Sequence, residues 1–488
     1  MSVLLRFRMA RLVAILLLVA VADPALGQAT DAPETDLSFA PPDDRPAPGQ
    51  QMRQSARCRT ATVLPTPEVL GPAPGTSMLN VVGAWRHSTG RGVRIAVIDT
   101  GVNPSSRLPV LGGGDYIEGG DGLHDCDLHG TIVASIIAAA PAASNRPGSD
   151  SAGMDSGVIP GPVGNRVLAS RAGPLDGFFG VAPDATLISI RQSSELFRSK
   201  DFSATDPELQ TRAGTVETLA RAVVHAADLG ATVINVSVAA CLPAADPLDL
   251  RALGGAVRYA ATVRDAVVVA AAGNERGETC AANPPTDPAA KEPRRGWNQL
   301  RTVSVPSVFP EYVLSVGAVD PSGAPLAGSL SGPWLGIAGP GSGIIGLSDG
   351  GAAVNAYAPG RTGESPVAFA GTSFAAAYVS GVAALVRSKY PKLNARQVIR
   401  RLQQTAHNPP GGRDAQVGYG VVDPLAALTF EVPTGDLPVA APLSRVLSLP
   451  AAPPAPDRRP RDSVLGFAAA VGCGAVLAGL YRRARRSR

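Results

Sequence analysis

Short apolar runs alternate with helical segments through the middle of the chain. The apolar runs are rich in Val, Ile and Ala and carry almost no charge: residues 93–102, 186–190, 233–238, 266–272 and 312–319. Runs of this kind are typical of parallel strands buried on both faces. Helical patterns fall at residues 129–138, 215–229, 257–263, 371–385 and 398–404. The alternation between residues 93 and 430 predicts an α/β fold with three layers around a central, mostly parallel sheet.

The N-terminal end has the pattern of a secretory signal. Arg6, Arg8 and Arg11 precede an apolar run at residues 12–22, and the small residues Ala25 and Gly27 follow. This order predicts a signal peptide over residues 1–27. The alternative is an uncleaved anchor, which the shortness of the apolar run disfavours.

The C-terminal end has the pattern of a membrane anchor. Residues 464–481 are apolar and uncharged, and the Arg-rich residues 482–488 follow directly. A run of about 18 apolar residues is long enough to cross a bilayer. We therefore expect one transmembrane helix over residues 463–481 and a cytoplasmic tail over 482–488, because basic residues favour the cytoplasmic side. The rest of the chain would lie outside the cytoplasm, and small residues four apart, such as Ala468 and Gly472, would let a partner helix dock.

Irregular segments flank and interrupt the central region. Residues 28–80, rich in Pro, Asp and Gln at their start, predict an N-terminal extension that wraps a domain over residues 81–430. Residues 139–177 form a long Gly- and Pro-rich insert, a typical site of proteolytic nicking. Residues 431–462 are a Pro-rich linker. The net charge of +4 is concentrated in arginines at the two ends, so there is no basic patch for nucleic acid.

Three polar residues stand where strands end or helices begin. Asp99 follows the apolar strand 93–98, His129 begins a helical run, and Ser373 begins an Ala-rich helix. The carboxyl ends of parallel strands gather at one edge of a sheet, so one crevice can collect all three. These residue types support acyl transfer, with Ser373 as nucleophile, His129 as general base and Asp99 orienting the imidazole. The alternative roles are structural: an N-cap for Ser373 and a turn cap for Asp99.

A fourth polar residue follows another strand. Asn274 comes after the strand end Ala271-Ala272-Gly273, where its amide could stabilise an oxyanion beside the backbone N–H of Ser373. A plain turn residue is the alternative. A zinc site near His129 and Cys126 is a rival hypothesis, but no second pair of ligands has metal spacing, so we expect no metal and no cofactor. Asp121, Asp125 and Asp127 are interpreted as a solvated loop.

These segments resemble the motifs of the subtilisin-like serine proteases. The similarity lies in residues 95–102, 128–135, 271–274 and 371–381, and the chain order Asp, His, Ser also matches. The resemblance covers roughly residues 80–430. It implies a subtilisin-like three-layer fold, the catalytic roles given above for Asp99, His129 and Ser373, and an oxyanion hole at Asn274.

The resemblance also implies a substrate site. Two edge segments would flank the first substrate pocket and bind an extended peptide through its backbone; they comprise Ser237, Val238 and Ala239, and Ala271, Ala272 and Gly273. The family more often has Gly where Ala239 stands, so we expect a small or medium apolar residue before the cleaved bond.

The cysteines suit an oxidising compartment. Of the five, Cys473 lies in the predicted membrane helix, and the other four allow three sets of pairs. We expect Cys241–Cys280, which would pin the outer rim of the pocket. We also expect Cys58–Cys126, which would tie the N-terminal extension beside His129.

The whole domain plan resembles the mycosins, membrane-anchored subtilases of type VII secretion systems. That resemblance implies a serine endopeptidase that cleaves secreted proteins and associates with the secretion membrane complex through its transmembrane helix and its ectodomain. The protease domain would lie on the extracytoplasmic, periplasmic side of the cell membrane. Two alternatives stay open: a mainly structural stabiliser of the secretion complex with dispensable proteolysis, and a general cell-surface protease.

Overall fold

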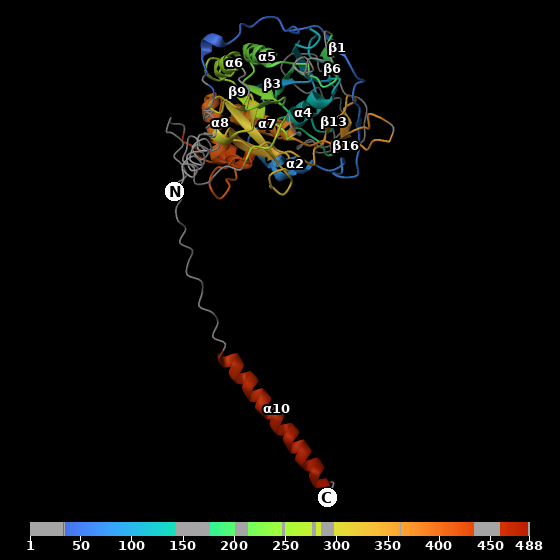
Figure 1. Cartoon of the computed structure of the whole chain (residues 1–488), viewed down its shortest axis with the longest axis vertical. Helices are drawn as coiled ribbons and strands as arrows, with labels where there is room; N and C mark the ends of the chain where they lie inside the picture. The colour runs from blue at the N-terminus through green and yellow to red at the C-terminus, as the bar shows by residue number, and fades with distance from the viewer. Residues whose placement is uncertain are drawn as a thin grey trace, which may run out of the picture. The chain divides into compact units, whose positions relative to one another are not determined.

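The computed structural model divides the chain into two compact units, Met1–Pro438 and Val439–Arg488, which are described separately (Figure 1). It describes residues 33, 35–142, 176–200, 213–245, 249–275, 280–284, 297–361, 363–433 and 459–486. The predicted signal peptide, most of the insert 139–177 and most of the linker 431–462 lie outside these residues.

A seven-stranded sheet forms the centre of the first unit. In spatial order its strands are β12 (Leu335–Pro340), β11 (Val313–Val319), β9 (Val267–Ala271), β7 (Val233–Val236), β3 (Arg94–Asp99), β5 (Thr186–Arg191) and β4 (Val110–Asp115). Every neighbouring pair is parallel. The carboxyl ends of β3, β7 and β9 therefore lie at the same edge of the sheet.

Helices cover both faces of this sheet (Figure 1). In β3, Ile95 and Val97 pack in one apolar cluster with α4 (His129–Ala138) and α7 (Thr372–Lys389). The alternate residues Ala96 and Ile98 pack in a second cluster with α5 (Val216–Asp228) and α6 (Arg251–Thr262). Successive side chains of a strand point to opposite faces, so a strand with helices on both sides is apolar throughout. The predicted α/β fold with a large parallel sheet is confirmed.

The remaining elements are short or peripheral. They are η1 (Leu37–Phe39), β1 (Met52–Gln54), β2 (Ala61–Thr62), α2 (Pro74–Met78), α3 (Val81–Ala84), β6 (Phe197–Ser199), β8 (Ala240–Pro243), η3 (Trp297–Gln299), β10 (Thr302–Val305), β13 (Gly346–Leu347), β14 (Ala353–Val354), β15 (Ala356–Tyr357), β16 (Val367–Ala368), α8 (Ala395–Gln404) and α9 (Pro424–Thr429). The sequence pattern did not predict the two outer strands of the main sheet, β4 and β12. Both contain glycines, which interrupt the apolar run that marks the inner strands.

The described part of the N-terminal extension runs over the surface of this unit and adds strands to it. β1 pairs with β6 in an antiparallel ladder, and β2 pairs with β15. A later part of the extension is held by the side chain of Asn355. This side chain accepts the backbone N–H of Leu64 at 2.7 Å and donates to the carbonyl oxygens of Leu64 and Pro67. These contacts fasten the extension through backbone hydrogen bonds, which leave little trace in its sequence.

Both expected disulfides are present. Cys58–Cys126 joins the extension to the loop before His129, and Cys241–Cys280 joins β8 to the segment after Asn274. Cys473 is a free, exposed thiol. The loop closed by Cys58 and Cys126 spans 68 residues. By the chain-entropy model, closing a loop of this size stabilises the fold by roughly 4 kcal/mol.

The second unit contains one long helix, α10 (Arg459–Arg486). Among the helices that the structure describes, none is both long enough and apolar enough to cross a membrane. The helix includes the residues 463–481 that were predicted to span the bilayer.

Candidate active site

Asp99 and His129 meet at the carboxyl edge of the sheet. Asp99 is the last residue of β3 and is fully buried, and His129 is the first residue of α4. The Nδ1 atom of His129 lies 2.7 Å from Oδ1 of Asp99. The same oxygen accepts the backbone N–H of Thr100 at 2.7 Å. An imidazole that donates from Nδ1 to a carboxylate keeps Nε2 free to accept a proton.

A glycine lets the helix start this close to the strand end. A Cβ on Gly130 would lie 2.1 Å from the carbonyl oxygen of Gly101 and 3.1 Å from Cβ of Asp99. Any larger residue at this position would push α4 away from β3. The His-Gly-Thr sequence therefore places the imidazole against the carboxylate by backbone packing.

Ser373 lies in the first turn of α7. It is the second residue of the helix, where backbone N–H groups have no partner within the helix. The adjacent Phe374 packs on His129 with the ring centres 5.4 Å apart. Gly371 precedes the helix with φ of 141°, in the region that favours glycine, and a Cβ there would lie 3.2 Å from the side-chain amide of Asn274.

Ser373 and Ser237 hold each other by reciprocal hydrogen bonds. The Ser373 hydroxyl donates to the carbonyl oxygen of Ser237 at 2.8 Å, and the Ser237 hydroxyl donates to the carbonyl oxygen of Ser373 at 3.0 Å. Behind this pair, Nδ2 of Asn235 donates to Ser237 Oγ at 2.8 Å, and the Ser380 hydroxyl donates to the side-chain Oδ1 of Asn235 at 2.9 Å. In this structure the Ser373 hydroxyl thus points to the end of β7.

Asn274 lies beside the first turn of α7. Its Oδ1 accepts the backbone N–H of Thr372 at 3.0 Å and the Thr372 hydroxyl at 3.3 Å. The Thr372 hydroxyl in turn accepts the backbone N–H of Gly273 at 3.2 Å. These bonds fix the carbonyl end of the Asn274 side chain, so the Nδ2 donor has a set orientation beside the first turn of α7.

The two predicted substrate segments directly follow neighbouring strands. Ser237, Val238 and Ala239 follow β7, and Ala271 ends β9 before Ala272 and Gly273. The disulfide Cys241–Cys280 lies next to them, because a Cβ on Gly273 would be 3.5 Å from Sγ of Cys241.

The charges around His129 favour the protonated form of its imidazole. Burial lowers the pKa of this imidazole, but the charge and hydrogen bond of Asp99 and the smaller effects of Asp125 and Glu195 together raise it more. The resulting pKa lies above the ordinary value of 6.5. Within the described residues, no cluster of three or more His, Cys, Asp or Glu has the arrangement of a metal site.

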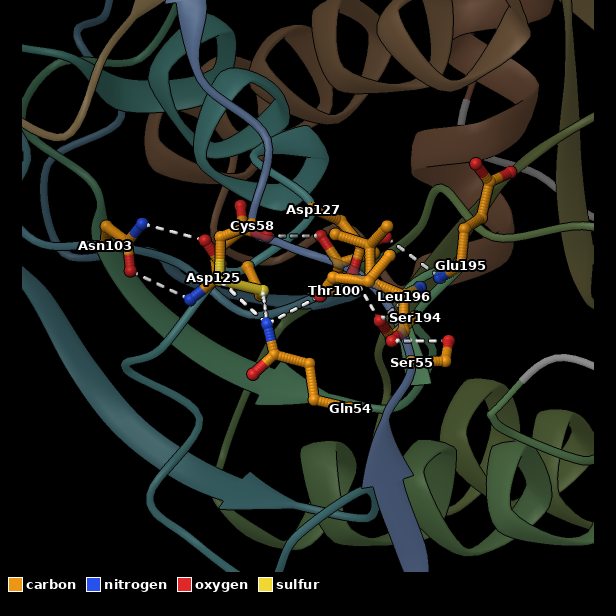
Figure 2. The surroundings of a disulfide bond; sticks show 12 residues. Gln54, Ser55, Cys58, Thr100, Asn103, Asp125, Asp127, Ser194, Glu195 and Leu196 are labelled. Atoms are coloured by element: carbon orange, nitrogen blue, oxygen red, sulfur yellow. Dashed lines mark hydrogen bonds between the residues drawn. A yellow bond between two sulfur atoms is a disulfide. The ribbon is translucent and has the colours of Figure 1, made fainter. Parts of the chain in front are cut away.

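The interpretation of Asp121, Asp125 and Asp127 as a solvated loop is wrong for two of the three. Asp125 is 4% exposed and Asp127 is 1% exposed, and only Asp121 faces solvent. Figure 2 shows both buried carboxylates flanking the Cys58–Cys126 disulfide. Sequence reasoning also missed Asn235 and Ser380. Their signal was available, since each is a polar residue inside an otherwise apolar strand or helix.

Known proteins are similar to this chain in sequence and fold. The model of the subtilase family matches residues 90–420. Mycosin-2 of Mycobacterium tuberculosis is 47% identical over 97% of this chain and 97% of its own length. The chain is a member of the mycosins, within the subtilase family of serine proteases.

Solved structures agree with this assignment. One of them is the structure of MycP1, a serine protease described as an essential component of the type VII (ESX-1) secretion system. MycP1 is 43% identical to this chain, with a TM-score of 0.71. The match covers 82% of this chain and 100% of the MycP1 chain. A chain from an intact ESX-5 inner membrane complex is 46% identical with a TM-score of 0.73, covering 92% of this mycosin and 99% of its own length.

Proposed function

We propose that this mycosin is a membrane-anchored serine endopeptidase that cleaves proteins exported by a type VII secretion system. The observation that carries the proposal is the pairing of His129 with Asp99, whose Nδ1 and Oδ1 atoms are 2.7 Å apart at the carboxyl edge of the sheet. Ser373 lies in the first turn of α7. A buried carboxylate, an imidazole and a serine hydroxyl at a helix N-terminus together provide the groups that acyl transfer needs.

The acylation step uses these three side chains in sequence. Ser373 Oγ attacks the carbonyl carbon of the scissile peptide bond, and its proton passes to Nε2 of His129. Asp99 stabilises the imidazolium that forms. His129 then donates this proton to the leaving amine, the C–N bond breaks, and an acyl ester on Ser373 remains. Water attacks the ester by the same route, which releases the acid and restores the serine.

The oxyanion of each tetrahedral intermediate needs donors that are already in place. Nδ2 of Asn274 and the backbone N–H of Ser373 are the proposed pair. Support comes from the two hydrogen bonds that Oδ1 of Asn274 accepts from Thr372, since they leave only the amino group of this side chain for a ligand. The positive end of the α7 dipole adds to the stabilisation.

Substrate recognition is proposed to occur through the strand-end segments of β7 and β9. An extended peptide would lie against Ser237, Val238 and Ala239 on one side and Ala271, Ala272 and Gly273 on the other. Its backbone would compete with Ser373 for the Ser237 carbonyl, which would free the nucleophile to turn toward His129. A small or medium apolar residue before the cleaved bond suits the Ala-lined segments.

Association with the secretion membrane complex is the second part of the proposal. It is supported by the chain of the ESX-5 inner membrane complex that this mycosin matches over 92% of its length. The signal peptide over 1–27, the anchor over 463–481 and the cytoplasmic tail over 482–488 are proposed from the sequence alone. They would place the protease domain on the periplasmic side.

A secretion assay separates the enzymatic role from the alternatives. Cells that lack this mycosin are complemented with the wild-type chain, with Ser373→Ala or with a chain that ends at residue 462. We expect Ser373→Ala to co-purify with the membrane complex and sustain secretion while substrate processing is lost. A loss of secretion with Ser373→Ala would contradict a role that is independent of proteolysis. Broad digestion of unrelated proteins by the wild-type chain would instead favour a general protease.

The reactivity of Ser373 is expected to rise with pH. His129 must be neutral to accept the serine proton. Burial lowers its pKa, but the charge and hydrogen bond of Asp99, with the charges of Asp125 and Glu195, together raise it above the ordinary 6.5. The second-order rate constant of labelling by a fluorophosphonate probe should therefore fall as the pH drops through a midpoint above 6.5. A midpoint well below this value would contradict the Asp99–His129 pairing.

Removing the Asn274 amide is expected to slow catalysis without unfolding the protein. In subtilisin, the loss of one oxyanion-hole donor lowers kcat by about 10²–10³-fold, and we expect the same range for Asn274→Ala. Asn274→Asp keeps the oxygen that binds Thr372 but loses the donor, so it should be similarly slow. The exposed Asn408 provides the control, because Asn408→Ala should react like the wild type. Full activity of both Asn274 variants would rule out this oxyanion hole.

A further inference from the structure

The carboxyl group of Asp125 lies between the end of β3 and the start of α4. Its Oδ1 accepts the Thr100 hydroxyl at 2.8 Å. Its Oδ2 accepts both the backbone N–H and the hydroxyl of Thr131, at 2.8 Å and 2.7 Å. Figure 2 shows the Asp125 side chain beside Thr100 and the Cys58–Cys126 disulfide. The Asp125 main chain is held separately by the side chain of Asn103.

The direction of these hydrogen bonds is fixed by their neighbours. The Thr100 hydroxyl oxygen accepts the backbone N–H of Gly130 at 2.9 Å, and the Thr131 hydroxyl oxygen accepts the backbone N–H of Asn103 at 3.0 Å. Each hydroxyl therefore has its proton free to donate, and each donates it to Asp125. With the Thr131 N–H, the carboxyl group receives three donors, an environment that suits a carboxylate.

These bonds join the two segments that carry the catalytic pair. Thr100 directly follows Asp99, and Gly130 and Thr131 directly follow His129. We propose that Asp125 is a positioning residue that holds His129 in hydrogen-bonding register with Asp99. This inference rests on the proposed function of the pair, and it assigns Asp125 no contact with the substrate.

Burial opposes the charged form of Asp125, and its three hydrogen-bond donors favour that form. Burial raises the pKa of this carboxyl group to about 7, while the hydrogen bonds from Thr131 and Thr100 lower it and the charge of Asp99 raises it. His129 and the Tyr357 hydroxyl are the other titratable groups that respond to its charge. A proton on Asp125 would turn one acceptor into a donor and displace one of the two threonine hydroxyls.

The matched variants are Asp125→Asn and Asp127→Asn in the full-length chain. Both replace a buried carboxylate beside Cys126, but Asp127 bonds to Ser194 and to the backbone of Glu195, not to the segments of the catalytic pair. The amide group introduced by Asp125→Asn would point a donor at groups that already donate. A catalytic group that is misplaced by 1 Å can lower the reaction rate by about 10²-fold. We therefore expect Asp125→Asn to lower the rate constant of fluorophosphonate labelling by about 10- to 100-fold. Asp127→Asn should stay within about twofold of the wild type.

A second pair of variants tests the same contact from the other side. Thr131→Ser keeps the hydroxyl and should be labelled at the wild-type rate. Thr131→Val lacks the hydroxyl, so its labelling rate should fall as it does in Asp125→Asn. This pair also provides the answer if Asp125→Asn does not fold. Equal losses for Asp125→Asn and Asp127→Asn, or wild-type labelling of both Asp125→Asn and Thr131→Val, would overturn the proposal.

Proton NMR of the full-length chain reports on the position of His129 and does not require the protein to be catalytically active. The Nδ1–H proton of His129 should give a low-field resonance in the wild type and in Asp127→Asn. It should broaden or shift in Asp125→Asn. An unchanged resonance in Asp125→Asn would overturn the positioning role even if Ser373 itself proved unreactive. Failure of the wild type to label, with the resonance behaving as expected, would instead count against the proposed function alone.

Discussion

Replacement of Ser373 by alanine is expected to abolish peptide cleavage and fluorophosphonate labelling. The alanine lacks the oxygen that forms the acyl ester, so only binding and the oxyanion donors remain. Removing the nucleophile from subtilisin, a relative in the same family, lowers kcat by about 10⁶-fold, and we expect a loss of that order. Cleavage of a quenched fluorogenic peptide library and gel detection of the labelled chain measure it.

The control for Ser373→Ala lies on the same helix. Ser388 is near the other end of α7, where its hydroxyl donates to the carbonyl oxygen of Arg91 at 2.8 Å. Ser388→Ala should therefore keep the activity and labelling of the wild type. If Ser373→Ala retained a tenth of the wild-type activity, Ser373 would not be the nucleophile.

The second large loss is expected for Asp99→Asn. The asparagine is nearly the same size and can still accept the Thr100 N–H, but it lacks the negative charge that stabilises the His129 imidazolium. The corresponding substitution in a trypsin-like protease with the same three residues lowers kcat by about 10⁴-fold. We expect a similar loss here, together with a shift of the labelling midpoint to lower pH, because the charge of Asp99 is the largest of the effects that raise the His129 pKa.

The exposed carboxylate Asp121 serves as the control for Asp99→Asn. It lies in the loop before His129 and accepts the backbone N–H of Leu123 at 2.9 Å. Asp121→Asn should leave both the labelling rate and its pH midpoint unchanged. An Asp99→Asn variant with a midpoint at or above that of the wild type would contradict the assigned role of the carboxylate.

The inner strands of the sheet were predictable because burial on both faces leaves a local signature. β3, β7 and β9 are nearly continuous apolar runs, and the polar residues at or after their carboxyl ends mark the proposed active-site edge. The outer strands β4 and β12 carry glycines, so they have no such signature. Their place in the sheet depends on pairing with β5 and β11.

Residues that act through distant partners were harder to predict. Asp99, His129 and Ser373 stand at element boundaries, where residue type and position together suggest chemistry. Asp125 lies in a loop among other acidic residues, where exposure to solvent is the ordinary expectation for a carboxylate. It is buried because two threonine hydroxyls from other segments reach it, and that three-dimensional convergence is absent from the local sequence pattern.

Covalent labelling of the full-length chain tests the catalytic assignment most directly. The chain is incubated with a fluorophosphonate probe at a pH above the His129 midpoint, digested, and mapped by mass spectrometry. We predict a single adduct on the peptide that contains Ser373, and none in the Ser373→Ala variant. An adduct on another residue, or an unlabelled wild-type chain, would contradict the proposal that Asp99, His129 and Ser373 form the active site.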